Sequence, residues 1–320
     1  MLKKMICILL TAAMLLAVSA CGTQDMPNEN EQAEYTDYTE QAVFSETGWR
    51  NTVVYLVSDD GFIVPVMKRI PWEEGIARAA IEQLIATDEN LLETAKRGLN
   101  PTVPNGTEVE ISIKDGCATA NLLNFEQLST AEQEKNMLVS IVNTLTEFES
   151  IDRVTVKVNG KSGKLANGTE LPEELSRLPL NISETVEASA SGDTKPVTLF
   201  FANESCSLNI PITRYMSEPT FEKAVMALLA GDSNEEVKCC FPEGTVLISA
   251  EISNNTATVN LSSDFNSVEF SPGVDIAAYE TLFLTACGFG EINELVLLVD
   301  GMEFSKFSSE TVPPKYVNEF

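Results

Sequence analysis

Apolar and polar residues alternate along two stretches of the chain, which predicts two strands that each bury one face. The alternating apolar positions are Val109, Ile111 and Ile113 in the first stretch and Ile248, Ala250 and Ile252 in the second. Both strands follow a Pro-x-Gly-Thr sequence, at residues 104–107 and 242–245. We therefore expect two related strands whose apolar side chains face the interior.

Each alternating stretch ends in a turn and resumes as a second strand, which predicts a β-hairpin. The turn residues are Lys114, Asp115 and Gly116 in the first hairpin and Ser253, Asn254 and Asn255 in the second. An Asp-Gly pair tolerates the positive φ angles that tight hairpins need. The second copy has one extra residue after its glycine, which predicts a bulge or a longer turn. Both return strands read Ala-Thr-x-Asn-Leu, at residues 118–122 and 257–261.

Helical periodicity occurs on both sides of each hairpin. In the first copy the apolar stripes are Ile76, Ala79, Ala80 and Leu84, then Leu138, Ile141, Val142, Leu145 and Phe148. In the second copy they are Phe221, Val225, Leu228 and Leu229, then Tyr279, Leu282, Phe283 and Ala286. Residues 129–132 form a capping box that opens the helix after the first hairpin. Matching residues keep a constant spacing through the second helix and the last strand, which indicates an internal duplication.

Each copy thus reads strand, helix, hairpin, helix, strand. This order predicts an α+β fold of two tandem repeats, in which two helices cover one face of a small, mostly antiparallel sheet. We place the first domain at residues 49–167 and the second at 196–308. Residues 168–195 are expected to link them, and residues 309–320 to form a tail. Each domain is long enough to have its own core.

The N-terminus has the pattern of a secretory signal. Lys3 and Lys4 precede an apolar run at residues 5–18 that is too short to span a bilayer. Small residues then precede Cys21, as in a bacterial lipobox. We expect residues 1–20 to be removed and Cys21 to be acylated, which would tether the chain to the outer face of the membrane. The alternative is an ordinary signal peptide with Cys21 incidental.

Residues 21–48 are rich in Asp and Glu and contain no Lys or Arg, so we expect a disordered acidic spacer. The whole chain has a formal net charge of -27. This charge argues against binding to nucleic acid and against direct docking on anionic lipids. Neutral, basic or metal-bridged partners remain.

The duplicated hairpin, returning as Ala-Thr-x-Asn-Leu and flanked by helices, resembles the GerMN domain. Two copies behind a lipid-anchoring signal are similar to the tandem-GerMN lipoproteins of sporulation and germination. The resemblance implies a fold like that of ring-building modules in secretion-type assemblies. It also implies a location at the outer forespore membrane, on the mother-cell side. There such a protein is expected to help position the forespore intermembrane channel complex.

The residues that usually carry catalysis are largely missing. The chain has no histidine, which excludes Ser-His-Asp and Cys-His catalysis and the commonest zinc-ligand sets. Asp59 and Asp60 match a calcium loop only in part, because the spaced acids and the terminal Glu are missing. We therefore expect no catalytic residue, no cofactor and no metal site, and the lipidated Cys21 as the one modified residue.

Carboxylates leave an acid-base enzyme open as an alternative, because a glycosidase pair needs only a separation of roughly 5 to 9.5 Å in a cleft. The acids near the first hairpin and the following helix are Glu108, Glu110, Asp115, Glu147, Glu149 and Asp152. Their positions on a polar strand face, in a turn and at a helix end favour solvated surface.

Five cysteines follow Cys7 and Cys21, and an odd number leaves at least one thiol unpaired. They are Cys117, Cys206, Cys239, Cys240 and Cys287. We interpret them as small, partly buried residues. A disulfide between Cys206 and either Cys239 or Cys240 stays open.

Three classes of function fit these observations. The first, our hypothesis, is a non-enzymatic scaffold that binds membrane lipid through Cys21 and other envelope proteins through its domains, with oligomer or ring assembly open. It predicts exposed strand edges or an apolar patch. The second is a regulatory or ligand-binding lipoprotein that modulates a membrane sensor, which predicts a deep pocket between the repeats. The third is an enzyme acting on cortex peptidoglycan, which predicts a carboxylate pair in a groove.

Overall fold

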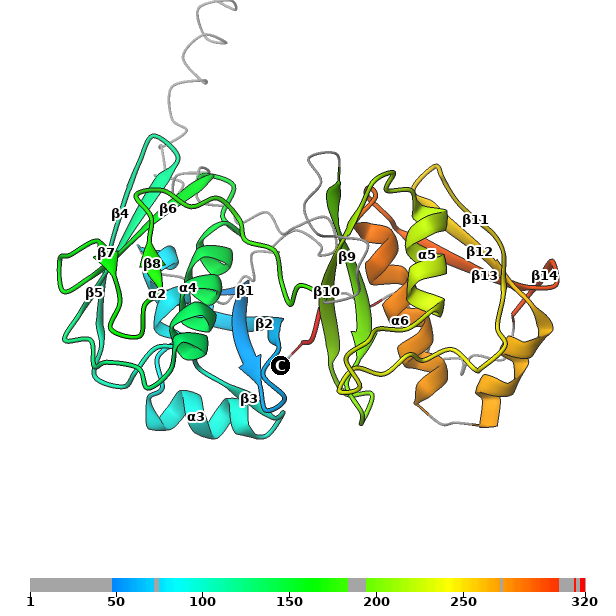
Figure 1. The fold of residues 1–320 in the computed structure, drawn as a ribbon, viewed down its shortest axis with the longest axis horizontal. Helices are drawn as coiled ribbons and strands as arrows, with labels where there is room; N and C mark the ends of the chain where they lie inside the picture. The colour runs from blue at the N-terminus through cyan, green and yellow to red at the C-terminus, as the bar shows by residue number, and fades with distance from the viewer. Residues whose placement is uncertain are drawn as a thin grey trace, which may run out of the picture. The chain divides into compact units, whose positions relative to one another are not determined.

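The computed structural model describes residues 48–71, 75–183, 194–270, 273–304, 314 and 317–319 (Figure 1). All of these residues fall within one compact unit, Gln32–Phe320. Cys21, the predicted signal peptide and nearly all of the predicted acidic spacer lie outside the described residues.

The first repeat contains two three-stranded sheets with two helices between them. One sheet has the order β2-β1-β3 and consists of β1 (Trp49–Ser58), β2 (Ile63–Pro71) and β3 (Leu99–Asn100). The other has the order β4-β5-β6 and consists of β4 (Glu108–Lys114), β5 (Cys117–Leu123) and β6 (Arg153–Val158). The other elements are the helices α2 (Ile76–Glu82), α3 (Asp88–Ala95) and α4 (Ala131–Leu145) and the strand pair β7 (Gly163–Lys164) and β8 (Glu170–Leu171). Both α2 and α4 contact strands of the two sheets.

The second repeat has the same plan. Its first sheet is the hairpin of β9 (Lys195–Ala202) and β10 (Asn209–Met216). Its larger sheet has the order β11-β12-β13-β14 and consists of β11 (Leu247–Ser253), β12 (Thr256–Leu261), β13 (Glu294–Val299) and β14 (Met302–Glu303). The helical elements are α5 (Phe221–Leu229), the 3-10 segment η2 (Ser263–Phe270) and α6 (Val274–Cys287). Figure 1 shows α5 and α6 lying between the two sheets, and each helix contacts strands of both.

The α+β class and the duplication are confirmed, but the strands of each repeat divide between two sheets. Both central hairpins are antiparallel, and each return strand pairs in parallel with the strand that follows the long helix. Residues Val53, Val54, Tyr55 and Leu56 of β1 are all 0% exposed, so both faces of this strand are covered. Val54 and Leu56 join the main core, whereas Val53 and Tyr55 join a separate cluster.

In each repeat the long helix forms the same hydrogen bond to the N-terminal hairpin, which is β1–β2 in the first repeat and β9–β10 in the second. The hydroxyl of Thr144 on α4 accepts from the backbone N–H of Tyr55 at 3.1 Å. The hydroxyl of Thr285 on α6 accepts from the backbone N–H of Phe200 at 3.0 Å. Both threonines are fully buried, so the bond satisfies polar groups inside the core.

The capping box at the start of α4 lies one residue later than predicted. Thr130 is the N-cap, and its hydroxyl accepts from the N–H of Gln133 at 3.1 Å. The Gln133 side chain accepts from the N–H of Ser129 at 3.0 Å. Because Thr130 keeps an extended backbone, Ser129 stays outside the helix.

Candidate partner-binding surface

The outer strand of the larger sheet in the second repeat carries a β-bulge, as predicted. β11 pairs with β12, and the register shifts between Leu247 and Ser249. Leu247 lies opposite Leu261. In the first repeat, Val109 lies opposite Leu122 in the same way. Leu247 is therefore the counterpart of Val109, and the residue after it is the extra one.

Ile248 is this extra residue, and the prediction that it faces the interior is wrong. Its side chain is 51% exposed, whereas Val109 is 9% exposed. The same prediction is wrong for Ile113, near the end of β4, which is 46% exposed. Side chains alternate along a strand, so an inserted residue cannot keep the inward position that Leu247 already fills. The bulge thus places an isoleucine on the surface.

Val246 extends this apolar surface. It is 60% exposed, and it follows Pro-x-Gly-Thr at the position that Glu108 has in the first repeat. Glu108 accepts a hydrogen bond from the Asn124 side chain at 3.0 Å. The same place on the two repeats is therefore acidic in one and apolar in the other.

Both β4 and β11 are edge strands, since each comes first in its sheet order. An edge presents backbone N–H and C=O groups that can pair with another strand, and proteins often blunt it with charge. β4 has two exposed acids, Glu108 and Glu110, whereas β11 has one, Glu251, which lies three residues beyond Ile248. Within the described ranges no strand covers the outer side of β11. We call Val246, Ile248 and the outer backbone of β11 the β11 edge.

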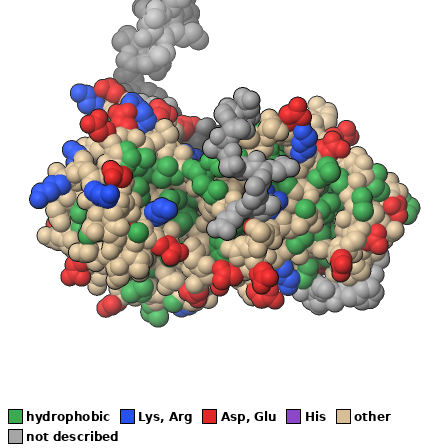
Figure 2. Space-filling model, viewed as in Figure 1, with side chains coloured by type: hydrophobic (Ala, Val, Ile, Leu, Met, Phe, Trp, Pro, Cys, Tyr) green, Lys and Arg blue, Asp and Glu red, His purple; other side chains and the backbone are tan. Residues whose placement is uncertain are grey.

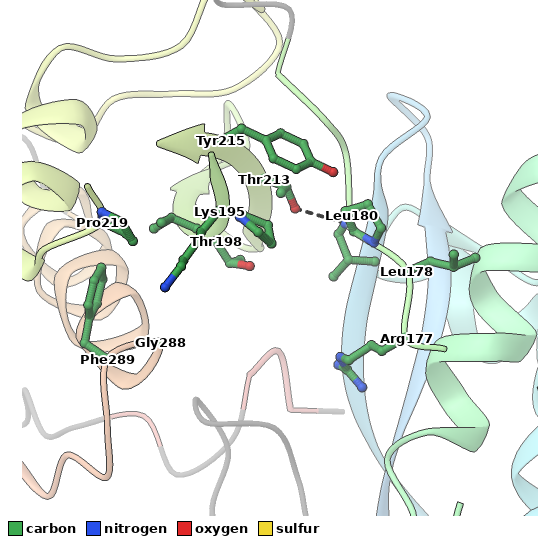
Figure 3. Close-up of a pocket in the computed structure, with 13 residues that line it drawn as sticks. Arg177, Leu178, Leu180, Lys195, Thr198, Thr213, Tyr215, Pro219, Gly288 and Phe289 are labelled. Carbon is green, nitrogen blue, oxygen red and sulfur yellow. Dashed lines mark hydrogen bonds between the residues drawn. The ribbon is translucent and has the colours of Figure 1, made fainter. Parts of the chain in front are cut away.

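A second surface feature is an open groove of about 470 Å³ along β9 and β10. Its lining combines apolar side chains such as Leu178 and Phe289 with the basic side chains of Arg177 and Lys195. Figure 3 shows the ends of Arg177 and Lys195 reaching into the same open space. No acidic residue is among the described residues that line it. Because Arg177 is paired with Glu147, Lys195 is the basic side chain with which the groove could bind an anionic or carboxylate-bearing ligand.

Arg177 also closes a buried polar cluster, and here the interpretation of Glu147 as solvated surface is wrong. Glu147 is 0% exposed, and its Oε1 accepts from Tyr55 Oη at 2.6 Å and from Arg177 Nη2 at 2.6 Å. Arg177 also donates to the Tyr55 hydroxyl. The carboxylate is thus neutralised and held in place, which suits a structural role.

The other weighed acids lie on the surface. Glu108, Glu110, Glu149 and Asp152 are exposed, as are Asp59, Asp60 and the turn residue Asp115. Figure 2 shows acidic and basic side chains scattered over one face of the molecule. Among the described residues, no group of three His, Cys, Asp or Glu side chains is placed to hold a metal ion.

Glu134 on α4 is a buried carboxylate that sequence reasoning missed. It accepts hydrogen bonds from the N–H of Asn167 at 2.7 Å and from the N–H of Thr169 at 3.1 Å. It also accepts from the Asn167 side chain at 3.1 Å. Burial raises the pKa of Glu134, but these hydrogen bonds outweigh burial and leave the pKa lowered. The residue fixes the loop after β7.

All five downstream cysteines lie in the described part of the chain, where none of them forms a disulfide. Cys240 is buried, and burial together with the neighbouring Cys206 and Cys239 raises the pKa of its thiol to about 12. Burial likewise raises the pKa of Cys239.

None of the helices in the described ranges has the length and apolar composition needed to cross a membrane.

The fold defines a class: tandem α+β repeat proteins in which each repeat holds helices between two small sheets. The chain matches the family model Germane, described as "Sporulation and spore germination", at residues 53–164 and 198–304. These ranges cover well over half of the chain. The chain therefore belongs to the Germane family, whose repeat is the GerMN domain.

Two relatives show how far the similarity extends. The chain is 28% identical over 235 residues to the spore germination protein GerM of Bacillus subtilis (strain 168). That alignment covers 64% of this chain and 63% of the relative, which is less than two thirds of its length. The structure matches the tandem GerMN domains of the sporulation protein GerM from Bacillus subtilis with a TM-score of 0.67 at 24% identity. The match covers 84% of this chain and 98% of the other, and it confirms the tandem-GerMN fold.

Proposed function

We propose that this chain is a membrane-anchored lipoprotein that acts as a non-enzymatic scaffold in sporulation and spore germination. Acylated Cys21 is the anchor, supported by the charged start, the apolar run and the small residues before the cysteine. The β11 edge is the binding surface, and its exposed bulge residue Ile248 is the observation that carries the proposal.

The partner is an extended segment of another envelope protein that adds a strand to β11. In strand addition, main-chain hydrogen bonds give affinity and alternate side chains give specificity. Burying Val246 and Ile248 would contribute on the order of 1–2 kcal/mol each, because both are still largely exposed. The net charge of -27 favours a neutral or basic partner.

The similarity to the spore germination protein GerM supports the part of the proposal that concerns sporulation and germination. In sporulating cells the protein would lie on the outer forespore membrane, facing the space between the two membranes. There it would help position the forespore intermembrane channel complex. An oligomer or a ring of this protein would form only if a second copy of the chain supplied the added strand.

Three variants of the full chain in a spore-forming host test this proposal. Cys21→Ala should move the protein from the membrane fraction to the soluble fraction. Ile248→Glu should stay in the membrane at normal abundance, yet reduce germination as much as deletion of the gene. Ile113→Glu is the matched control, because Ile113 is 46% exposed on the edge strand β4 of the first repeat. Normal germination with Ile248→Glu would contradict the proposed binding surface.

The groove of Figure 3 favours a second candidate, a ligand-binding lipoprotein that modulates a membrane sensor. Lys195 would bind an anionic group, while Leu178 and Phe289 contact an apolar part of the ligand. Loss of germination in Lys195→Glu, together with normal germination in Ile248→Glu, would favour this candidate over the scaffold.

A further inference from the structure

The two repeats exchange short segments across the seam where β2 and β10 meet. The segment that follows the first repeat bridges to the second, through a parallel bridge between Ile182 and Thr213 of β10. The segment at the end of the chain bridges back to the first repeat, through a parallel bridge between Glu319 and Met67 of β2. Each repeat is thus bound by the segment that follows the other repeat.

An asparagine side chain is central to each exchange. Asn181 accepts from the N–H of Ile63 at 2.8 Å and donates to the carbonyl of Ile63 at 2.7 Å. It also donates to the carbonyl of Pro211 at 2.7 Å. Ile63 is the first residue of β2 and Pro211 the third residue of β10, so one amide joins both hairpins.

Asn318 makes the same three bonds with the repeats reversed. It accepts from the N–H of Asn209 at 2.7 Å and donates to the carbonyl of Asn209 at 2.8 Å. It also donates to the carbonyl of Pro65 at 3.0 Å. Asn209 is the first residue of β10 and Pro65 the third residue of β2. The seam therefore contains two equivalent binding positions for an asparagine side chain, which we call seats: one holds Asn181 and the other holds Asn318.

The seats select a particular kind of segment. A primary amide provides two N–H donors and one carbonyl oxygen, and each asparagine uses all of these groups. Both asparagines have positive φ, 44° for Asn181 and 50° for Asn318, which asparagine tolerates better than most residues. An aliphatic residue precedes each one and is buried, Leu180 at 4% and Val317 at 0% exposure. Two separate parts of the chain thus meet the same requirement.

We propose that the seam is a binding site for short segments with an aliphatic-Asn pair, and that residues 317–319 are its resident ligand. Bound in this way, the C-terminal segment acts as a latch that joins the β1–β2 hairpin of the first repeat to the β9–β10 hairpin of the second. The backbone carbonyl of Asn318 also accepts from the N–H of Met67 at 3.2 Å, so the whole segment is seated and not only the amide.

Hydrogen exchange of the full chain tests the latch. Asn318→Ala should speed exchange about tenfold at the amides of both Asn209 and Met67, because the segment leaves its seat. Asn318→Asp keeps the shape of the side chain but loses the donors, and it should act in the same direction. Asn159→Ala is the matched control, since Asn159 also has positive φ (50°) but lies in the turn after β6. Unchanged exchange at Met67 in both Asn318 variants would overturn the proposal.

A peptide added in trans provides the second measurement. A synthetic peptide of residues 314–320, added to the Asn318→Ala chain, should slow exchange at Asn209 and Met67 again. The same peptide with alanine in place of the asparagine should have no effect. If both peptides act equally, or if neither does, the seam is not a selective binding site.

Discussion

At the residue scale, Glu134 shows how one buried side chain stabilises a loop. Its carboxylate accepts three hydrogen bonds from Asn167 and Thr169. Glu134→Gln turns part of this acceptor into a donor that faces other N–H groups. We expect the variant to lose about 1–3 kcal/mol of unfolding free energy at pH 7, measured by chemical denaturation.

The pH dependence of this loss follows from the direction of the pKa shift. Hydrogen bonds lower the pKa of Glu134 in the folded state despite its burial. Its stabilising contribution is therefore present above the pKa of an unfolded glutamate and is lost as the pH falls through the folded-state pKa. The gap between wild type and Glu134→Gln should narrow on acidification. Glu132→Gln, on the exposed side of the first turn of α4, is the control, and an equal loss there would contradict this role.

Single residues were also where sequence reasoning failed. The position of Glu147 after the last turn of a helix predicts solvent exposure, yet the residue is fully buried. It lies one turn beyond Asn143 and Thr144, which are also fully buried, so α4 has polar residues on a covered face. The partner that makes this possible, Arg177, is distant in sequence, and no local pattern indicates the pairing.

At the scale of an element, two substitutions in the β11–β12 hairpin distinguish a binding role for Ile248 from a structural one. Ile248→Ala should change the unfolding free energy by no more than about 0.5 kcal/mol, because its side chain is half exposed. Leu261→Ala on β12 should cost about 2–5 kcal/mol, because Leu261 is 0% exposed. Urea unfolding of both variants measures the difference. A large loss for Ile248→Ala would mean that the residue serves packing.

Elements with local signals were well predicted. The first hairpin turn has Asp115 and Gly116 at φ values of 50° and 74°, as an Asp-Gly turn requires. The extra residue in the second copy correctly indicated a bulge, but its outward side chain required the pairing register. The separate sheet that contains the β1–β2 hairpin was not predicted. The apolar run in β1 is compatible with either sheet, so it does not indicate which one the strand joins.

At the scale of the whole molecule, the duplication was visible in the sequence because it repeats over every element of the fold. The seam between the repeats was not. Asn181 and Asn318 read as ordinary turn residues, and their partners lie more than a hundred residues away in several cases. Long-range contacts of this kind are set by the folded geometry and leave no local pattern.

Site-specific photo-cross-linking in sporulating cells tests most directly whether the β11 edge binds a partner. A photoreactive amino acid replaces Ile248 in the full chain, and the matched position is Ile113 on the edge strand of the first repeat. The scaffold proposal predicts one discrete cross-linked envelope protein from position 248, its loss when Val246→Glu is added, and no such product from position 113. No product from position 248, or the same products from both positions, would contradict it.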